Sequence, residues 1–576
     1  MSEMLAVKAE VASRTKDPPH WEKIATRCVI TGALAYWAFT LFWFWRYCGH
    51  NINIDAISYI GIARHITDRN FVASLHGYWS PLVSWLIAAT SLAGHDYTLN
   101  ARLLMIPAFG TCLFLIYRLT LKLWDSPLLA SLAVLWFTVA RGISAFSVYF
   151  IGADLILTAF VLLYFVLLLS CLDAPHDFQN WLWLGSAHAV AFFAKAIAMP
   201  LLALSTAVAV IWIFRRAPRQ AVRSLAAAAL IPALCWVGWG VALKQKYRVF
   251  TTGYQLHWNL LDPSVRAAEA RATGFSTLRD DRAVFDNYMV SESMPPGSGY
   301  WRMSVLKPGL LRQIALKEVG NVPQAAKELM VLLTPGGMLA FLLCLIRLTR
   351  FRETEEARFR FAWIALITTA ALVLAYSMLV FDGRYVIPVA AVLMSLGVRF
   401  VLPEQWIEKT AGQTHAIGLG SPIQAGLGLL LLLGLIGVQV YRSSPWRSIQ
   451  QDFQSSTYDA ATILDQANAH TAVVIGQGPY PEHGVGWEAG IYSAYFSGTH
   501  IVGDVEDVPR PDQVPSLIDD IQKLNPDAVM IWGSESSAAY STVAGKLKQV
   551  YPHGTMVAIR DPKRGLVGSI LVNALR

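Results

Sequence analysis

The stretch NINIDAISYIGIARHITDRNF, residues 51–71, decides how this chain is interpreted. It follows an apolar run at 28–47 that is rich in Trp and Phe, and it places an acid, Asp55, where that run ends. An Asp in this position commonly caps a helix by accepting hydrogen bonds from the first turn. The segment therefore predicts a helix that starts at Asp55. Capping alone does not account for the polar side chains that follow along the same helix. These are Tyr59, Arg64 and His65.

The composition predicts a membrane protein that crosses the bilayer several times. The chain has 576 residues, of which 55% are hydrophobic and only 15% are charged. A soluble chain of this size carries more charge. The six cysteines lie in or beside apolar runs and have neither metal-ligand nor disulfide spacing, so we interpret them as small apolar residues. The net charge of +8 falls mostly in short loops between spans, which argues against nucleic acid as a partner.

Apolar runs long enough to cross about 30 Å of hydrocarbon recur about eleven times. They lie near 28–47, 100–120, 126–141, 153–171, 181–197, 199–214, 225–243, 329–347, 360–380, 385–401 and 422–440. Basic residues precede the first run and follow the second, sixth and eighth runs, which places the N-terminus in the cytoplasm; the loop CLDAPHDFQN after the fourth run is acidic, but acids contribute little to orientation. An odd number of spans then puts the first loop, the long loop at 244–328 and the C-terminal part on the outer side.

The chain divides into a membrane module, 1–445, and an α/β domain, 455–576. The first outer loop, 48–99, is expected to hold the helix at Asp55 and a second helix within 80–94, which is too short to cross the membrane. After the last span, helical segments alternate with short apolar strands, a pattern typical of a small domain around a mostly parallel sheet. We expect this domain to shape an acceptor site, because its loop GQGPYPEHGVG matches no nucleotide-binding motif.

Several motifs together resemble one family of membrane enzymes. In chain order they are DAISYIGIAR (55–64), GYWSPLVSWLIA (77–88), FFAKAIAMPLLAL (192–204), RVFTTGYQLHWNLLDP (248–263) and DGRYVIPVAAVLMSL (382–396). They resemble the membrane glycosyltransferases of the GT-C fold, in particular the bacterial relatives of protein O-mannosyltransferases and the aminoarabinose transferases that act on lipid A. The resemblance covers roughly residues 20–400. It implies a GT-C fold of about eleven membrane helices with a small α/β domain on the outer side.

The resemblance also implies an activity, the transfer of one sugar from a polyprenyl-phosphate donor to an acceptor outside the cytoplasm. Asp55 would be the base that deprotonates the acceptor hydroxyl. The phosphate leaving group needs positive charge rather than an acid, and Lys195 and Arg384 are the candidates. A single base and a direct displacement predict inversion at the anomeric carbon. The resemblance implies no cofactor, and we expect no metal because Ala56 stands where family members often have a second acid.

The candidate substrate-binding residues come from the loops and span ends that carry these motifs. They are Tyr59, Arg64, His65, Tyr78, Trp79, Asp154, Lys195, Arg384 and Tyr385. Structural alternatives stand beside three of them. Lys195 could extend to the outer headgroups, Arg384 could pair with Asp382, and Asp154 could simply start a helix. The chain also has Trp-Ser-Pro at 79–81 where the aminoarabinose transferases have Lys-Pro-Pro, so that phosphate contact is missing or supplied elsewhere.

Two other functions stay open from the sequence. One is an O-antigen polymerase or ligase, which would use a preassembled lipid-linked glycan. The other is a lipid or glycan transporter, which predicts repeat symmetry and charged residues near mid-span. The interpretation we favour places the chain in a bacterial inner membrane with its site facing outward. Its partners would be the lipid-linked donor, membrane lipids, and a lipid, glycan or protein acceptor.

The predicted topology can be tested with a reporter enzyme that is active only outside the cytoplasm. Fused after Pro445, the reporter is expected to be active, because an odd number of spans precedes it. Fused after Arg219, in a basic loop, it is expected to be silent. Reversed activity at either position would contradict the span count and separate the C-terminal domain from the side of Asp55.

Overall fold

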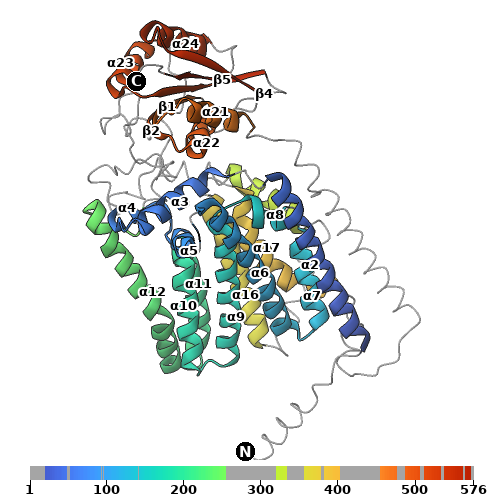
Figure 1. Cartoon of the computed structure of the whole chain (residues 1–576). Helices are drawn as coiled ribbons and strands as arrows, with labels where there is room; N and C mark the ends of the chain where they lie inside the picture. The colour runs from blue at the N-terminus through green and yellow to red at the C-terminus, as the bar shows by residue number, and fades with distance from the viewer. Residues whose placement is uncertain are drawn as a thin grey trace, which may run out of the picture.

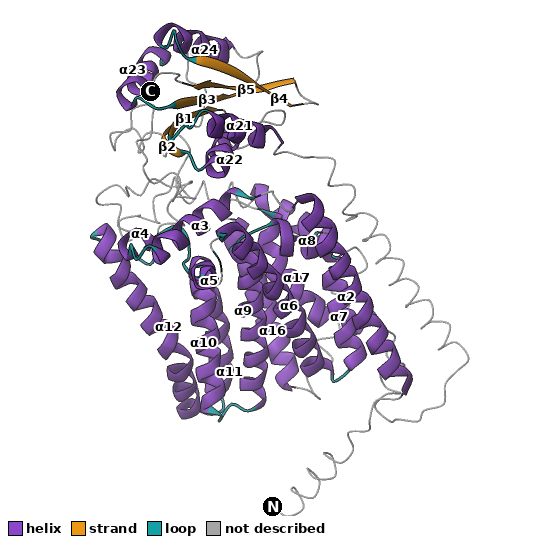
Figure 2. Ribbon diagram, viewed as in Figure 1, coloured by secondary structure: helices purple, strands orange, loops and turns teal. Residues whose placement is uncertain are grey.

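The computed structural model describes residues 20–48, 52–92, 94, 96–140, 142–253, 319–333, 356–377, 382–401, 455–476, 487–505, 512–533, 538–561 and 565–572. Its first part is a bundle of helices (Figures 1 and 2). The bundle contains α2 (His20–Cys48), α3 (Ile54–Thr67), α4 (Phe71–Ser74), α5 (Leu82–Ser91), α6 (Tyr97–Trp124), α7 (Pro127–Val139), α8 (Ile143–Tyr149), α9 (Ala153–Asp173), α10 (Phe178–Ala194), α11 (Ala198–Phe214), α12 (Pro218–Tyr247), α16 (Glu356–Ser377) and α17 (Ile387–Gly397). Single 3-10 turns, η3 (Gly383–Val386) and η4 (Val398–Val401), flank α17. Residues 319–333 are also helical.

The bundle has the dimensions of a multi-pass membrane protein. Among the described residues, five helices are long and apolar enough to cross a membrane: α2, α6, α9, α12 and α16. The pair α7 and α8 passes the same test as one span that bends by 57° near Gly142, whose backbone is left-handed (φ 72°). The predicted span at 422–440, most of that at 329–347 and most of the loop at 244–328 lie outside the described residues, so the count of eleven stays a prediction.

The first outer loop forms the helices expected of it, at one end of the bundle (Figure 1). Helix α3 begins at Ile54, one residue before Asp55, and α5 occupies the segment predicted within 80–94. The buried side of α5 is formed by Val83, Ser84, Ile87, Ala88 and Ser91. Helix α4 is an additional short turn that the sequence did not suggest. The loop therefore forms a layer of short helices over the ends of the spans.

The C-terminal part is a five-stranded sheet between two pairs of helices. Its elements are α21 (Ser455–Gln466), β1 (Thr471–Gly476), α22 (Trp487–Ser497), β2 (His500–Val505), α23 (Val514–Leu524), β3 (Ala528–Trp532), α24 (Ala538–Val550), β4 (Thr555–Asp561) and β5 (Gly565–Val572). Alternate residues of β1 face opposite layers, as the pleat requires. Ala472 and Val474 pack with α21 and α22, whereas Val473 and Ile475 pack with α23 and α24.

The expectation of a mostly parallel sheet was wrong in part. The strand order is β2-β1-β3-β5-β4, and only the pairings of β1 with β2 and with β3 are parallel. Strand β5 runs antiparallel to both β3 and β4. The physical reason is the short connection between β4 and β5, because a parallel pair needs a crossover of a dozen or more residues.

The α/β part lies over the end of the bundle that carries α3 (Figure 1). Its α22 contacts α3. Tyr495 of α22 shares a hydrogen bond of 2.6 Å between its hydroxyl and that of Thr98. The guanidinium of Arg64 lies between two rings, 5.5 Å from the centre of Tyr97 and 5.4 Å from that of Tyr495. The two parts of the chain are therefore joined at the C-terminal end of α3.

Candidate active site

Four charged side chains from separate parts of the chain meet at the end of the bundle beneath α3. Asp55 lies in the first turn of α3 and Asp154 in the first turn of α9. Lys195 follows the last residue of α10, and Arg384 lies in η3. Each therefore sits at a helix end, on the side of the bundle that carries α3.

The four groups form a continuous set of ion pairs. Arg384 Nη1 donates to Asp55 Oδ2 at 2.6 Å, and Lys195 Nζ donates to Asp154 Oδ1 at 2.5 Å. Arg384 Nε lies 3.9 Å from Asp154 Oδ2, which links the two pairs, and 3.0 Å from Asp382 Oδ2. The predicted alternative partner of Arg384, Asp382, is thus present together with Asp55. Lys195 points to Asp154.

Burial makes this arrangement energetically significant. The side chains of Asp55, Arg384 and Lys195 are 17%, 14% and 13% exposed, and that of Asp154 only 4%. Taking a charge out of water is unfavourable unless it is paired. Removing one member of a pair would therefore leave its partner buried without a compensating charge. Two carboxylates balance two cations within the cluster. Asp382 is half exposed and lies at its edge. The cluster is held in place by mutual charge, with Asp55 its most accessible buried acid.

Aromatic rings hold the two cations. Lys195 Nζ lies 4.3 Å from the centre of the Tyr385 ring and 5.6 Å from that of Tyr376. These two tyrosines stack with their ring centres 4.4 Å apart. The guanidinium of Arg384 lies 4.6 Å from the centre of Phe150. A cation over a ring face is stabilised by the negative π surface, so the rings fix both cations without neutralising them.

A second group of rings stands behind Asp55. Tyr59, one turn along α3, is buried and packs edge-on against Trp79 with ring centres 5.1 Å apart. Tyr78 packs against the same indole at 4.9 Å. Burial raises the pKa of the Tyr59 hydroxyl well above its usual value, and the charges of Asp55 and Asp154 raise it further. Tyr59 is therefore neutral at physiological pH and can act only as a hydrogen-bonding group.

Two of the predicted residues lie elsewhere. Arg64 is nine residues from Asp55, about 13 Å along a helix that rises 1.5 Å per residue, and it sits between Tyr97 and Tyr495. His65 lies beside it in the last turn of α3. Neither residue belongs to the charge cluster. Among the predicted substrate-binding residues, Arg64 and His65 therefore have the least support from this geometry.

Other residues of the cluster escaped the sequence analysis. Tyr376 and Phe150 contact the two cations, yet aromatic residues are common at any membrane interface, so nothing in the sequence marked them. Ser80 was noted only as a departure from Lys-Pro-Pro. Its hydroxyl accepts a hydrogen bond from the Ala196 N–H at 3.1 Å, which ties the first outer loop to the segment that carries Lys195.

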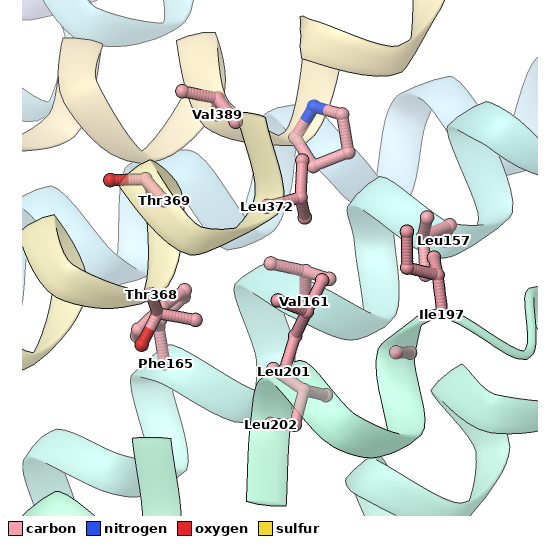
Figure 3. A pocket seen from close by; sticks show the side chains of 12 residues that line it. Leu157, Val161, Phe165, Ile197, Leu201, Leu202, Thr368, Thr369, Leu372 and Val389 are labelled. Carbon is pink, nitrogen blue, oxygen red and sulfur yellow. The ribbon is translucent and has the colours of Figure 1, made fainter. Parts of the chain in front are cut away.

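An apolar groove begins about one helical turn along the chain from the charged residues, since its Leu157 follows Asp154 by three residues; Figure 3 shows its lining. Its walls come from α9, α11, α16 and α17, the helices whose ends carry or adjoin the cluster. The lining residues are Leu157, Val161, Phe165, Ile197, Ala198, Leu201, Leu202, Thr368, Thr369, Leu372, Pro388 and Val389. The two threonine hydroxyls donate to main-chain carbonyls of their own helix, so the wall stays apolar.

No group of three His, Cys, Asp or Glu residues arranged to hold a metal ion occurs in the part of the chain that the structure describes. Metal independence remains a prediction.

Comparison with solved structures defines the fold. The chain matches ArnT from Cupriavidus metallidurans bound to undecaprenyl phosphate with a TM-score of 0.52 over 95% of this chain and 97% of that one, at 14% identity. The apo state of the same protein matches equally well. The archaeal oligosaccharyltransferase AglB from Archaeoglobus fulgidus, in complex with an inhibitory peptide and a dolichol-phosphate, matches with a TM-score of 0.50 at 12% identity, over 96% of this chain and 74% of that one.

The chain therefore has the GT-C fold, as its motifs predicted. It is a multi-pass membrane protein with a small C-terminal sheet. No protein-family description matches the sequence, and no curated protein matches it. Identities of 12–14% show a shared architecture and do not establish an activity.

His76 organises the loop that carries Tyr78 and Trp79. Its Nδ1 accepts hydrogen bonds from the N–H groups of both residues, at 3.0 and 3.1 Å. Lys246 of α12 holds the same loop by donating to the carbonyl of Leu75 at 2.8 Å. Burial lowers the pKa of His76 to about 3, and the nearby charge of Lys246 contributes. A neutral imidazole is what this loop requires, since a protonated Nδ1 cannot accept.

Stability is therefore expected to fall as the pH falls. The folded chain keeps His76 neutral down to about pH 3, whereas the unfolded chain protonates it near pH 6.5. Between these values the unfolded state binds more protons, so lowering the pH from 7 to 5 removes roughly 2 kcal/mol from the free energy of unfolding. Thermal unfolding in detergent checks this against His76→Asn, whose Oδ1 can replace Nδ1 but does not titrate. Equal losses in both proteins would contradict the assignment, because the other histidines are common to them.

Proposed function

We propose that this protein is an inverting glycosyltransferase that moves a monosaccharide from a polyprenyl-phosphate donor to an acceptor on the outer face of the membrane. The observation that carries the proposal is the cluster at the head of the apolar groove. There the accessible carboxylate of Asp55 lies 2.6 Å from the guanidinium of Arg384, with the ammonium of Lys195 beside them on Asp154. One group can accept a proton, and two can bind phosphate.

The donor is accommodated by the groove and the two cations together. An isoprenoid chain needs an apolar path within the membrane, and we place that path along the apolar lining of the groove, on the helices whose ends carry Lys195 and Arg384. Both cations lie at helix ends, the depth at which a lipid phosphate sits. The solved structures of the same fold support this class of ligand, because ArnT was solved with undecaprenyl phosphate and AglB with a dolichol-phosphate.

The reaction follows from the charges. Asp55 removes the proton from the acceptor hydroxyl as its oxygen attacks the anomeric carbon. The bond from that carbon to the phosphate oxygen breaks on the opposite face, so the configuration inverts. Arg384 and Lys195 stabilise the charge that develops on the departing phosphate. Arg384 offers several N–H donors in one plane, so it can contact the phosphate and Asp55 at once. It would then fix the distance between the donor phosphate and the base.

The surroundings suggest where the acceptor arrives. The α/β part lies over the same end of the bundle as Asp55, and its Tyr495 contacts Arg64 of α3 and hydrogen-bonds Thr98 of α6. A lipid, glycan or protein acceptor would then reach Asp55 beneath this part. The basic loops at the other ends of the spans favour an inner-membrane protein whose site faces the periplasm.

The alternatives explain less of the geometry. A transporter is expected to place its binding site near the middle of the bilayer, whereas this cluster lies at helix ends. A polymerase or ligase for preassembled glycans would draw its decisive groups from a late outer loop. Here the more accessible of the two buried carboxylates, Asp55, comes from the helix that follows the first span.

Replacing Asp55 tests the base. Asp55→Asn keeps an acceptor for Arg384 but cannot take a proton, so transfer is expected to fall by roughly 10²–10⁴-fold while undecaprenyl phosphate still binds. Turnover can be followed in membrane extract by mass spectrometry of the polyprenyl phosphate released. The matched control is Asp382→Asn, which also removes a negative charge 3.0 Å from Arg384. If both variants lose activity equally, Asp55 is only a counter-ion; if Asp55→Asn is fully active, the base is assigned wrongly.

Replacing the cations tests phosphate binding. Arg384→Ala and Lys195→Ala are each expected to weaken binding of undecaprenyl phosphate by about 1.5–3 kcal/mol, the contribution of a charge-assisted hydrogen bond. Arg384→Lys should recover only part of the affinity, because the planar fork is lost. Lys122→Ala is the control, since this lysine also forms an ion pair, with Asp173 of α9. Unchanged affinity in both alanine variants would place the phosphate elsewhere.

A further inference from the structure

Asn53 occupies the N-cap position of α3 but does not cap it. No hydrogen bond links its side chain to the first turn of the helix. Its carboxamide turns instead to the chain between α8 and α9. Asn53 Nδ2 donates to the carbonyl of Ile151 at 2.9 Å, and its Oδ1 accepts from the N–H of the same residue at 2.8 Å. Asn70, at the start of α4, shows the ordinary behaviour, because its Oδ1 accepts from the N–H of Ala73.

The Ile151 main chain needs such a partner. Ile151 is fully buried and belongs to neither helix, so no secondary structure pairs its N–H and C=O groups. Buried main-chain groups are almost always hydrogen-bonded. A carboxamide presents a donor and an acceptor side by side, and it satisfies both groups of Ile151 as a neighbouring strand would.

This paired contact lies close in the chain to Asp55, to Asp154 and to the ring that contacts Arg384. Asn53 is two residues before Asp55, and Ile151 is three residues before Asp154. The residue next to Ile151 is Phe150, whose ring lies against the guanidinium of Arg384. One side chain thus fixes the start of the helix that carries Asp55 to the segment that places both Asp154 and the ring beneath Arg384.

We propose that Asn53 is a positioning residue for the transfer reaction, one that sets the location of Asp55 relative to Arg384 and Asp154. The expected effect on transfer rests on the proposed function, whereas the contact between Asn53 and Ile151 does not. Reaction rates are sensitive to displacements of about 1 Å in a reacting group. Loss of the contact is therefore expected to lower the rate of transfer more than it lowers binding of the donor.

Two substitutions separate positioning from capping. Ser and Asp cap helices as well as Asn does, yet Ser is too short to bridge both groups of Ile151, and Asp would oppose the Ile151 carbonyl with a second acceptor. Asn53→Ser and Asn53→Asp are therefore neutral if the residue only caps and defective if it positions Asp55. Asn70→Ser is the matched control at an ordinary cap in the same loop.

The contact is measured first, by hydrogen exchange and mass spectrometry on the detergent-solubilised protein. Asn53→Ser is expected to speed exchange in the peptide that contains Ile151, and Asn70→Ser is expected to leave it unchanged. Turnover is measured next in membrane extract, as release of undecaprenyl phosphate. The maximal rate of Asn53→Ser should fall at least tenfold, with the half-saturating amount of extract changed less than threefold.

The same substitution in an Asp55→Asn background completes the test. If Asn53 acts through Asp55, it should lower the residual rate no further there. Unchanged exchange at Ile151, a normal rate despite faster exchange, or an equal further loss in the Asp55→Asn background would each overturn the proposal. If Asp55→Asn alone is fully active, the proposed base and the positioning role both fail, while the exchange data still report whether the contact exists.

Discussion

The rest of the site depends on one ion pair, between Asp55 in the first helix after the first span and Arg384 near the end of the described bundle. The two residues are far apart in the sequence, and both are largely buried. A buried carboxylate is unfavourable without a partner charge, so the pair holds the loop at 48–99 on the late helices. It also joins the group that would accept a proton to the group that would receive the phosphate. In the reaction that we propose, binding and chemistry therefore share one contact.

The surrounding structure serves to hold this pair at a fixed depth. Asp154 and Lys195 form a second ion pair that offsets its charge, and tyrosine and phenylalanine rings close over both cations. Below them the walls become apolar within one helical turn. The transition from charge to hydrocarbon thus occurs over a few ångströms, as it does at the headgroup boundary of a bilayer.

Much of the fold could be predicted because membranes and sheets impose simple periods on sequence. Span length identified α2, α6, α9, α12 and α16, and alternating apolar strands identified the C-terminal sheet. Asp55, Lys195 and Arg384 could be chosen because they lie in motifs that resemble a known family, and Asp154 because an acid at the mouth of an apolar segment is unfavourable. Long-range pairing was beyond reach. Nothing local shows that Asn53 turns away from its own helix, that Tyr376 stacks on Tyr385, or that Arg64 packs against Tyr495 from the distant domain.

The bend between α7 and α8 has a consequence of its own. A straight helix continuing from α7 would carry residues 143–149 along the direction of the span, whereas α8 runs at 57° to α7 and has the left-handed Gly142 at its N-cap. That turn delivers Phe150 and Ile151 beneath the charged cluster. A bend that contains none of the four charges thus precedes the segment whose Phe150 ring lies against Arg384. In a homologous chain, moving this bend along the helix would present a different ring to the same charges, with every charged residue unchanged.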